Sequence, residues 1–524
     1  MSLNERKYLL PVLTVVFLLS TFLIPLRGED ENKRTREEWV KICEKKLKQV
    51  EAGMERWASA GIPPFKIRDI MLAEFIPNMK AGKYQEAEKV ADRALKMLKK
   101  GPLVYKPEDL KKYLRKTKET QYIILPIREA GQLYGGQTDG LDNGIQQTIA
   151  KIGKATDPRQ RNWGFHLIIH TWKFDPKHSV NKRADIARAV RSAFDVAIRN
   201  NVAVHFTIDS HEWENRPDLW NYADKEKPGY DPKNKANVEW IDWDGTPHPH
   251  RYRNWGVPES MAPVICYNSP HVLREVSRMI GEVVAPPIKA GLDRLKKEGK
   301  EYLFSGVTVG AEPSLPNYEN IDRLRPQIAK LMDQDGSPKA RLGFNALTNK
   351  GYSKTEPPKD FGRALAQINQ EYTSFWSQKL AEAGIPIQKM YTHVAAGAGV
   401  VGSPQVEFTN APLDIAFNHH SRPGWTTYPV GPFRNDFALL YEELARHGNP
   451  HWASTEASPT MGPSGGKHSL SMKDYLARHF DYGATVIVFN TGATSKALSD
   501  SLTEGVWGKE ALQAYREHLA PPSK

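Results

Sequence analysis

Two glutamates stand where a pair of carboxyl groups could do acid–base and nucleophilic chemistry. Glu312 ends the run SGVTVGAE and Glu456 ends the run WASTE, and both runs have the character of short buried strands. Retaining cleavage of a glycosidic bond needs two carboxyl groups roughly 5–5.5 Å apart, one to protonate the leaving oxygen and one to attack the anomeric carbon. Their environments must differ, because one stays protonated while the other is ionised. Glu312 and Glu456 are therefore the candidate catalytic pair.

Other polar and aromatic side chains lie at the ends of the expected strands, where they could bind hydroxyl groups and stack on sugar rings. The candidate substrate-binding residues are His170, Trp172, Asp209, His211, Trp213, His393, Asn418, His419, Trp425 and Asn490. The histidines also admit an alternative, a metal-dependent amidohydrolase or deacetylase. The His-x-His of barrel metallohydrolases is missing from the first expected strand, and His248 and His250 lie in a proline-flanked loop expected to be exposed. We therefore expect no metal and no cofactor.

Eight short β-branched runs, alternating with amphipathic helices, have to position these residues. The expected strands are 121–127, 165–171, 202–209, 305–312, 389–394, 413–418, 452–456 and 485–490. The expected helices between them are 143–154, 182–200, 272–297, 361–383, 435–447 and 473–482. Such alternation predicts a parallel sheet, and eight strands predict closure into an α/β (β/α)₈ TIM barrel. No glycine-rich phosphate fingerprint follows the first strand, which disfavours a dinucleotide-binding fold.

The residues ahead of the barrel predict a separate helical module. Helical periodicity covers 37–58, 67–79 and 82–98, and the last of these resembles one helix of a tetratricopeptide repeat. The predicted domains are residues 1–28 as a signal peptide or N-terminal anchor, 29–118 as the helical module and 119–524 as the catalytic barrel.

Charge and the N-terminal segment bear on partners and location. The formal net charge is +12, but the basic runs of the helical module alternate with Glu at helical spacing, which favours a solvated helix face over nucleic-acid binding. Residues 8–26 are apolar after Arg6 and Lys7, which is typical of a secretory signal peptide. Their length also suits a membrane anchor, so we expect a secreted or periplasmic protein with anchoring through 8–26 as the alternative. Cys43 and Cys266 fit either a disulfide or two separate thiols.

Over about residues 120–500 the sequence resembles the clan of (β/α)₈ glycoside hydrolases that includes the cellulase-like families. The pair Glu312-Pro313 resembles their Asn-Glu-Pro after strand four, Asp209-Ser210-His211 resembles their Asp-x-His after strand three, and Glu456 follows Ser454-Thr455 on strand seven. The resemblance implies Glu312 as acid/base, Glu456 as nucleophile, His211 as a site residue and a β-linked oligo- or polysaccharide as substrate. Ala311 stands where the clan usually has Asn, which removes a contact to the sugar 2-hydroxyl and keeps a non-catalytic carbohydrate-binding barrel as a further alternative.

Overall fold

The computed structural model describes residues 35–59, 65–100, 107–178, 185–253, 257–310, 312–395, 404–427, 435–458, 471–489 and 508–520. The expected signal or anchor segment 1–28, Ala311 and Asn490 lie outside the described residues. The chain divides into two compact units, residues 1–109 with 431–435 and residues 110–430 with 436–524, whereas the sequence analysis placed its boundary after residue 118. Within the described parts of the chain, no helix is long and apolar enough to cross a membrane.

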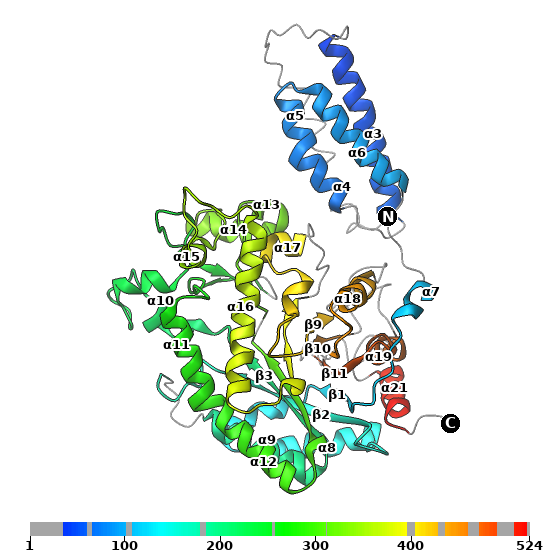
Figure 1. Ribbon diagram of the computed structural model, residues 1–524, viewed down its shortest axis with the longest axis vertical. Helices are drawn as coiled ribbons and strands as arrows, with labels where there is room; N and C mark the ends of the chain where they lie inside the picture. Colours follow the sequence, from blue (N-terminus) through cyan, green and yellow to red (C-terminus); the bar gives the residue numbers. More distant parts are fainter. Residues whose placement is uncertain are drawn as a thin grey trace. The chain divides into compact units, whose positions relative to one another are not determined.

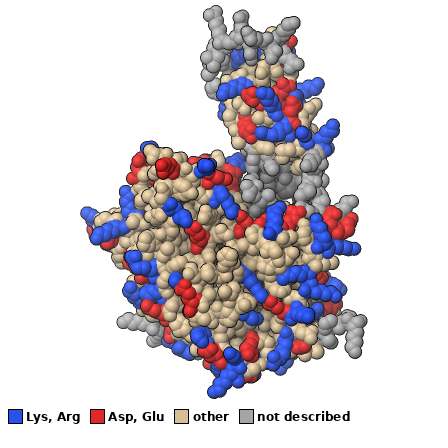
Figure 2. Space-filling model, viewed as in Figure 1, with Lys and Arg blue, Asp and Glu red and all other residues tan. Residues whose placement is uncertain are grey.

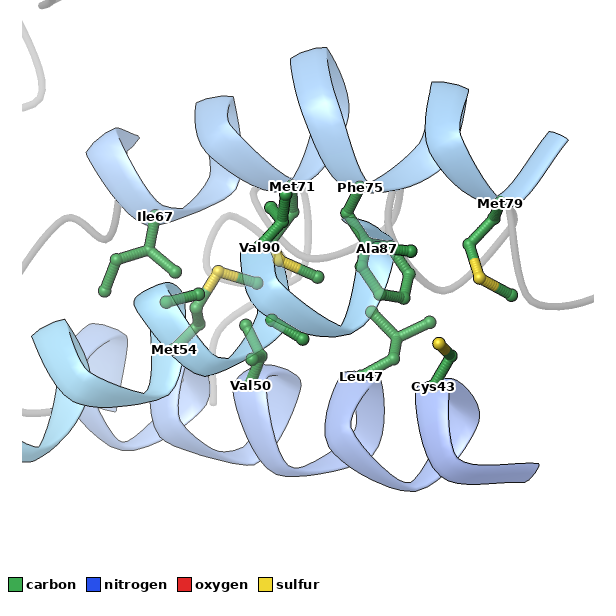
Figure 3. Packing of buried hydrophobic residues seen from close by; sticks show 12 residues of the cluster. Cys43, Leu47, Val50, Met54, Ile67, Met71, Phe75, Met79, Ala87 and Val90 are labelled. Atoms are coloured by element: carbon green, nitrogen blue, oxygen red, sulfur yellow. The ribbon is translucent and has the colours of Figure 1, made fainter. Parts of the chain in front are cut away.

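The N-terminal unit is built from helices (Figure 1), and these pack around one apolar core. Its helices are α3 (Arg36–Ser59), α4 (Phe65–Ile70), η1 (Met71–Phe75), α5 (Ile76–Lys80) and α6 (Tyr84–Lys100). The buried residues of the core are Cys43, Leu47, Val50, Met54, Ile67, Met71, Phe75, Met79, Ala87, Val90, Ala91 and Ala94 (Figure 3). They recur at helical spacing on each helix, so the periodicity of the sequence gives each helix a single buried face.

The outer faces of this unit carry charges of both signs (Figure 2). Lys46 on α3 lies 2.8 Å from Glu88 and 2.6 Å from Asp92 on α6, and Arg93 on α6 lies 2.6 Å from Glu74 on η1. The basic residues of this region therefore sit among acidic partners on solvated helix faces.

The second unit contains a closed parallel barrel. Its strands are β1 (Gln121–Leu125), β2 (Arg161–His170), β3 (Ala203–Asp209), β6 (Phe304–Val309), β7 (Met390–Thr392), β8 (Val394–Ala395), β9 (Gly424–Thr427), β10 (Trp452–Ala457) and β11 (Ala484–Phe489). β1 pairs with both β2 and β11, while β7 pairs with β6 and β8 pairs with β9. Because only His393 separates β7 from β8, the two form one strand, and the predicted eight-stranded (β/α)₈ barrel is confirmed.

Helices follow the strands and surround the sheet (Figure 1). The longer ones are α8 (Asp139–Ile152), α9 (Ile186–Asn200), α11 (Pro270–Arg278), η6 (Met279–Val284), α12 (Ala285–Lys297), α16 (Phe361–Glu382), α18 (Asn435–Arg446), α19 (Met472–Phe480) and α21 (Lys509–Leu519). Two long insertions follow β3 and β6. They hold α10 (Pro217–Trp220), η5 (Pro232–Asn237), the hairpin β4 (Arg251–Tyr252) and β5 (Ser260–Met261), α13 (Ile321–Leu324), α14 (Pro326–Asp335) and α15 (Phe344–Asn349).

One predicted strand was wrong. Residues 413–418 were expected to form strand six, but Leu413–Ala416 is a 3₁₀ turn (η9) after Pro412, and strand six is β9 at Gly424–Thr427. A side chain at Gly424 would place its Cβ 2.2 Å from the carbonyl oxygen of Thr392, so the close approach of β9 to β7 requires glycine there. Gly424 is thus what lets β9 lie against β7.

Candidate active site

Glu312 and Glu456 lie at the same end of the barrel, the carboxyl end of its parallel strands. Glu312 follows β6 after Gly310, whose φ of +71° turns the chain at the end of the strand. Glu456 lies on β10, where the pairing with β9 shifts register between Ser454 and Glu456, and such a bulge re-aims a side chain. One oxygen of each carboxyl lies within 4.8 Å of the other and of a nitrogen of His393. The structure therefore brings the two predicted catalytic residues together.

His393 joins the two carboxyl groups from between β7 and β8. Its Nε2 lies 3.3 Å from Oε2 of Glu456 and 3.7 Å from Oε1 of Glu312, and its side chain is 9% exposed. Burial alone would lower the pKa of His393, but the hydrogen bond to Glu456 and the charge of Glu312 outweigh it and raise the pKa. His393 is thus a cation-forming group placed against both carboxylates.

Thr426 on β9 contacts Glu312 and His393 and was not among the site residues predicted from the sequence. Its hydroxyl donates to Oε1 of Glu312, and its oxygen lies 3.0 Å from Nε2 of His393. Burial raises the pKa of Glu312, and the charge of Glu456 adds to the rise against the opposing effects of His393 and Thr426. The β-branched pair Thr426-Thr427 was the available signal, but strand six had been placed elsewhere.

A second polar cluster lies at the ends of β2 and β3. Nδ1 of His170 is 3.5 Å from Oδ2 of Asp209 and 3.4 Å from Oε1 of Glu212. Burial opposes the charged imidazole, but the two carboxylates outweigh it and raise the pKa of His170 to about 9. The pKa of Asp209 is held well below its ordinary value, against burial, mainly by the neighbouring imidazole of His170. At neutral pH this cluster is a histidine cation held between two carboxylates.

His211 lies between the two clusters. Its backbone N–H donates to Oδ1 of Asp209 at 2.9 Å, and its ring hydrogen-bonds to the backbone of Glu312. Burial lowers its pKa to about 4, so the imidazole is neutral at neutral pH. The predicted site residues His170, Asp209, His211 and His393 therefore belong to the neighbourhood of the carboxyl pair.

The predicted stacking tryptophans are core residues instead. Trp172 and Trp213 are 0% and 5% exposed and stack on each other with ring centres 4.4 Å apart. Trp425 is fully buried and donates from Nε1 to the carbonyl of Leu413 at 3.2 Å. Because side chains alternate along a strand, Trp425 points away from the barrel interior that its neighbour Thr426 faces. The three rings therefore pack in the interior of the described structure, and their contact with a sugar stays a prediction.

Asn418 and His419 lie at the opposite end of the barrel. They precede β9, and Asn418 donates from Nδ2 to Oγ of Ser421 at 2.9 Å, while His419 is exposed. In the same loop Arg422 lies 2.6 Å from Glu119, which precedes β1. Since the amino ends of parallel strands share one face, these two residues are remote from the carboxyl pair, and their prediction followed from the misplaced strand six.

Three further sequence expectations concern His248, the two cysteines and Asn490. His248 is buried and hydrogen-bonded to the backbone of His250 and Pro338, so its loop is not the exposed one expected. Cys43 and Cys266 are both buried free thiols. The predicted substrate residue Asn490 lies outside the described residues.

Three groups of possible metal-binding atoms occur among the described residues. They are Glu312 with His393 and Glu456, His170 with Asp209 and Glu212, and Asp175 with His178 and Glu275. In the first two, the carboxylates raise the pKa of the histidine, so a metal ion there would have to displace the proton of the imidazole. In the third, two arginines already neutralise the carboxylates. The third group therefore already has its counter-charges, whereas for the first two the expectation of no metal stays a prediction.

Comparison with known proteins adds similarities of fold. No protein-family model matches the sequence, and no curated protein matches it either. Among solved structures, the catalytic domain of a beta-amylase from Paenibacillus polymyxa is similar at 8% identity and a TM-score of 0.39, covering 78% of this chain and 100% of that one. A beta-1,4-mannanase is similar at 8% identity and a TM-score of 0.33, covering 77% and 99%. A beta-glucosidase is similar at 10% identity and a TM-score of 0.34, covering 69% and 78%. Strand pairing within this chain establishes its barrel.

Proposed function

We propose that the barrel is a retaining glycoside hydrolase that acts on a β-linked oligo- or polysaccharide, with Glu312 as acid/base and Glu456 as nucleophile. One observation carries the proposal: carboxyl oxygens from the ends of strands four and seven lie within 4.8 Å of each other. Retaining enzymes hold their carboxyl groups about 5–5.5 Å apart, whereas inverting enzymes leave about 6.5–9.5 Å for a water molecule. The β linkage follows from the resemblance of the sequence to the cellulase-like families.

The pKa causes at Glu312 fit both halves of a double displacement. In the first half, Glu456 attacks the anomeric carbon, the glycosidic bond breaks, and the leaving oxygen takes the proton of Glu312. The charge of Glu456 is one of the causes that raise the pKa of Glu312, and that charge disappears when Glu456 becomes an ester. In the second half, Glu312 is therefore better ionised and takes a proton from the water that displaces Glu456 from the sugar.

The test is hydrolysis of aryl glycosides, β-glucans, mannans and galactans by wild type, Glu312→Ala and Glu456→Ala. Glu301→Ala is the matched control, because Glu301 is an exposed carboxylate that precedes β6. We expect each site variant to lose about 10²–10⁴-fold or more in kcat, since that is the typical contribution of a positioned acid or base. NMR of the first product formed should show retained anomeric configuration.

Two further observations separate the roles of the glutamates. Azide should rescue Glu456→Ala with a product of inverted configuration and Glu312→Ala with a product of retained configuration. EDTA should leave the wild type unchanged. If both variants stay active, or EDTA alone abolishes activity, the two-carboxylate mechanism is wrong and a metal-dependent hydrolase becomes the better description.

We also propose that the protein works outside the cytoplasm, because residues 8–26 are apolar after two basic residues. Fractionation of cells that express the full chain tests this. N-terminal sequencing of the product then distinguishes a cleaved signal peptide from a retained anchor.

A further inference from the structure

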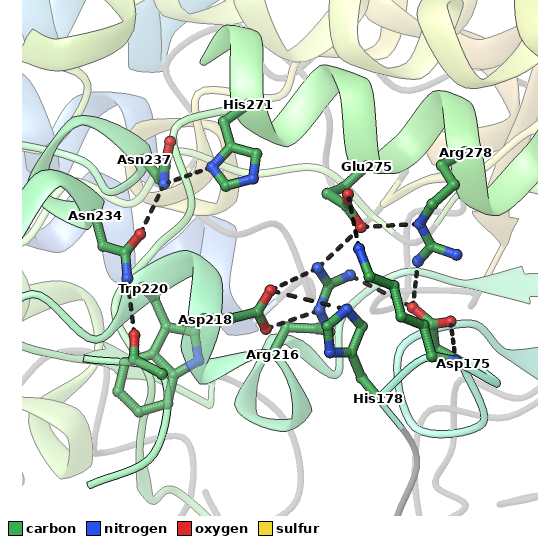
Figure 4. Close-up of polar contacts among 12 residues, drawn as sticks. Asp175, His178, Arg216, Asp218, Trp220, Asn234, Asn237, His271, Glu275 and Arg278 are labelled. Carbon is green, nitrogen blue, oxygen red and sulfur yellow. Dashed lines mark hydrogen bonds and ion pairs between the residues drawn. The ribbon is translucent and has the colours of Figure 1, made fainter. Parts of the chain in front are cut away.

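A buried arginine lies at the centre of an ion network beside the active site. The side chain of Arg216 is 1% exposed, and its Nη2 lies 2.8 Å from Oδ2 of Asp218 and 2.9 Å from Oε2 of Glu275 (Figure 4). Its Nη1 lies 3.5 Å from Oδ2 of Asp175, which is itself fully buried. Arg278 contacts the same Asp175 and lies 3.0 Å from Glu275. Two guanidinium groups thus contact three carboxylates, of which Asp175 is fully buried and Asp218 is 36% exposed.

The network joins three separate pieces of chain. Asp175 lies in the loop after β2, Arg216 and Asp218 lie in the loop after β3, and Glu275 and Arg278 lie on α11. Replacing a buried ion cluster by apolar residues is often neutral or stabilising, so such a cluster is weak evidence of a stabilising role. What it does fix is geometry, because Nε and Nη2 of Arg216 donate to Asp218 and Nη2 also donates to Glu275, although Nη1 has no hydrogen-bond partner among the described residues.

A chain of packed groups connects Arg216 to the polar cluster of the site. The guanidinium carbon lies 5.4 Å from the ring centre of Trp172, which stacks on Trp213. Trp172 follows His170 by two residues, and Trp213 follows Glu212 directly. Thr171 adds a hydrogen bond from its Oγ1 to the carbonyl of Asp209 at 2.8 Å. The loops that place His170 between its two carboxylates are therefore held to each other by Thr171 and by the Trp172–Trp213 stack, which Arg216 contacts through Trp172.

We propose that Arg216 is a positioning residue for the active site: it locks the loops after β2 and β3 together and so fixes the wall formed by His170, Asp209 and Glu212. Its guanidinium acts through the Trp172–Trp213 stack and does not touch the reacting atoms. The catalytic part of this inference rests on the proposed glycosidase function, whereas the positioning of His170 does not.

The experiment compares Arg216→Met, Arg216→Lys and Asp218→Asn in the full chain. The matched control is Arg294→Met, since Arg294 is a half-exposed arginine that pairs with Asp195 and Glu298. Two quantities are measured: kcat/KM on the substrate found in the glycoside panel, and the pKa of the His170 imidazole by ¹⁵N NMR of histidine-labelled protein. His170→Gln assigns the signal.

We expect Arg216→Met to lower kcat/KM about tenfold to a hundredfold, as a misplacement of about 1 Å does. The pKa of His170 should fall from about 9 toward its ordinary 6.5 as the carboxylates move away. Arg216→Lys should recover part of kcat/KM and part of the rise in the pKa of His170, because lysine keeps the positive charge but lacks the planar set of N–H donors. Arg294→Met should change neither.

A folded Arg216→Met with wild-type kcat/KM and an unchanged His170 pKa overturns the proposal. If Arg216→Met does not fold, Asp218→Asn decides by the same two measurements, because Asp218 is 36% exposed and its amide keeps the shape. If the wild type cleaves no glycoside but the pKa of His170 still falls in the variants, the glycosidase function fails and the positioning stands. If the wild type cleaves no glycoside and the pKa of His170 is also unchanged in the variants, the glycosidase function and the positioning role of Arg216 both fail.

Discussion

Replacing Thr426 by valine should raise the pKa of Glu312 and move the alkaline limb of the pH–rate profile. The hydroxyl of Thr426 donates to Oε1 of Glu312, which favours the ionised carboxylate, and valine removes this donor with little change of shape. A hydrogen bond to a charged group is worth about 1.5–3 kcal/mol, and one pKa unit corresponds to about 1.4 kcal/mol. The pKa of Glu312 should therefore rise by about one to two units.

The assay is kcat/KM against pH on a substrate with a poor leaving group, so that protonation by Glu312 counts in the transition state. Activity needs Glu312 protonated, so its alkaline limb should shift upward by the same one to two units. Thr427→Val is the control, because the Thr427 hydroxyl binds Ser454, Tyr475 and His479 instead. An alkaline limb that stays in place or moves downward in Thr426→Val would refute the assignment of Glu312 as the acid.

Four further predictions concern buried side chains and the end of the barrel opposite to the site. Burial raises the pKa of Glu239 from 4.5 to about 8, so the free energy of unfolding should fall as pH rises from about 4.5 through about 8. Glu239→Gln should flatten that dependence in thermal unfolding scans, and an unchanged slope would contradict the shift. Trp425→Ala should lower the free energy of unfolding by about 3–5 kcal/mol in denaturant unfolding, because it leaves a cavity at a core position. His419→Ala should leave kcat/KM within about twofold, because His419 lies at the end of the barrel opposite to the site. Phe75→Ala should destabilise the helical unit by about 3–5 kcal/mol in denaturant unfolding, and a loss below about 1 kcal/mol would mean that this ring is not in the core.

Local patterns in the sequence determined most of the elements. Strand–helix alternation predicts the barrel, because each short β-branched run has to be buried between the core and a covering helix. The helical spacing of Leu47, Val50 and Met54 likewise predicts one face of the N-terminal helices. The two catalytic candidates followed as well, since the carboxyl ends of parallel strands meet at one face whatever the loops do.

Tertiary structure alone decided which side chains share that face. The run 413–418 has the pattern of a strand, but the barrel uses Gly424–Thr427 as strand six, so the sequence misses Thr426 and misplaces Asn418. The burial of Trp172 could not be predicted from the sequence either. A tryptophan after a strand has the same sequence pattern whether its ring is exposed to a sugar or packs against Trp213 and Arg216. Proton affinities such as that of His170 depend on charges distant in sequence, which only the folded chain brings within a few ångströms.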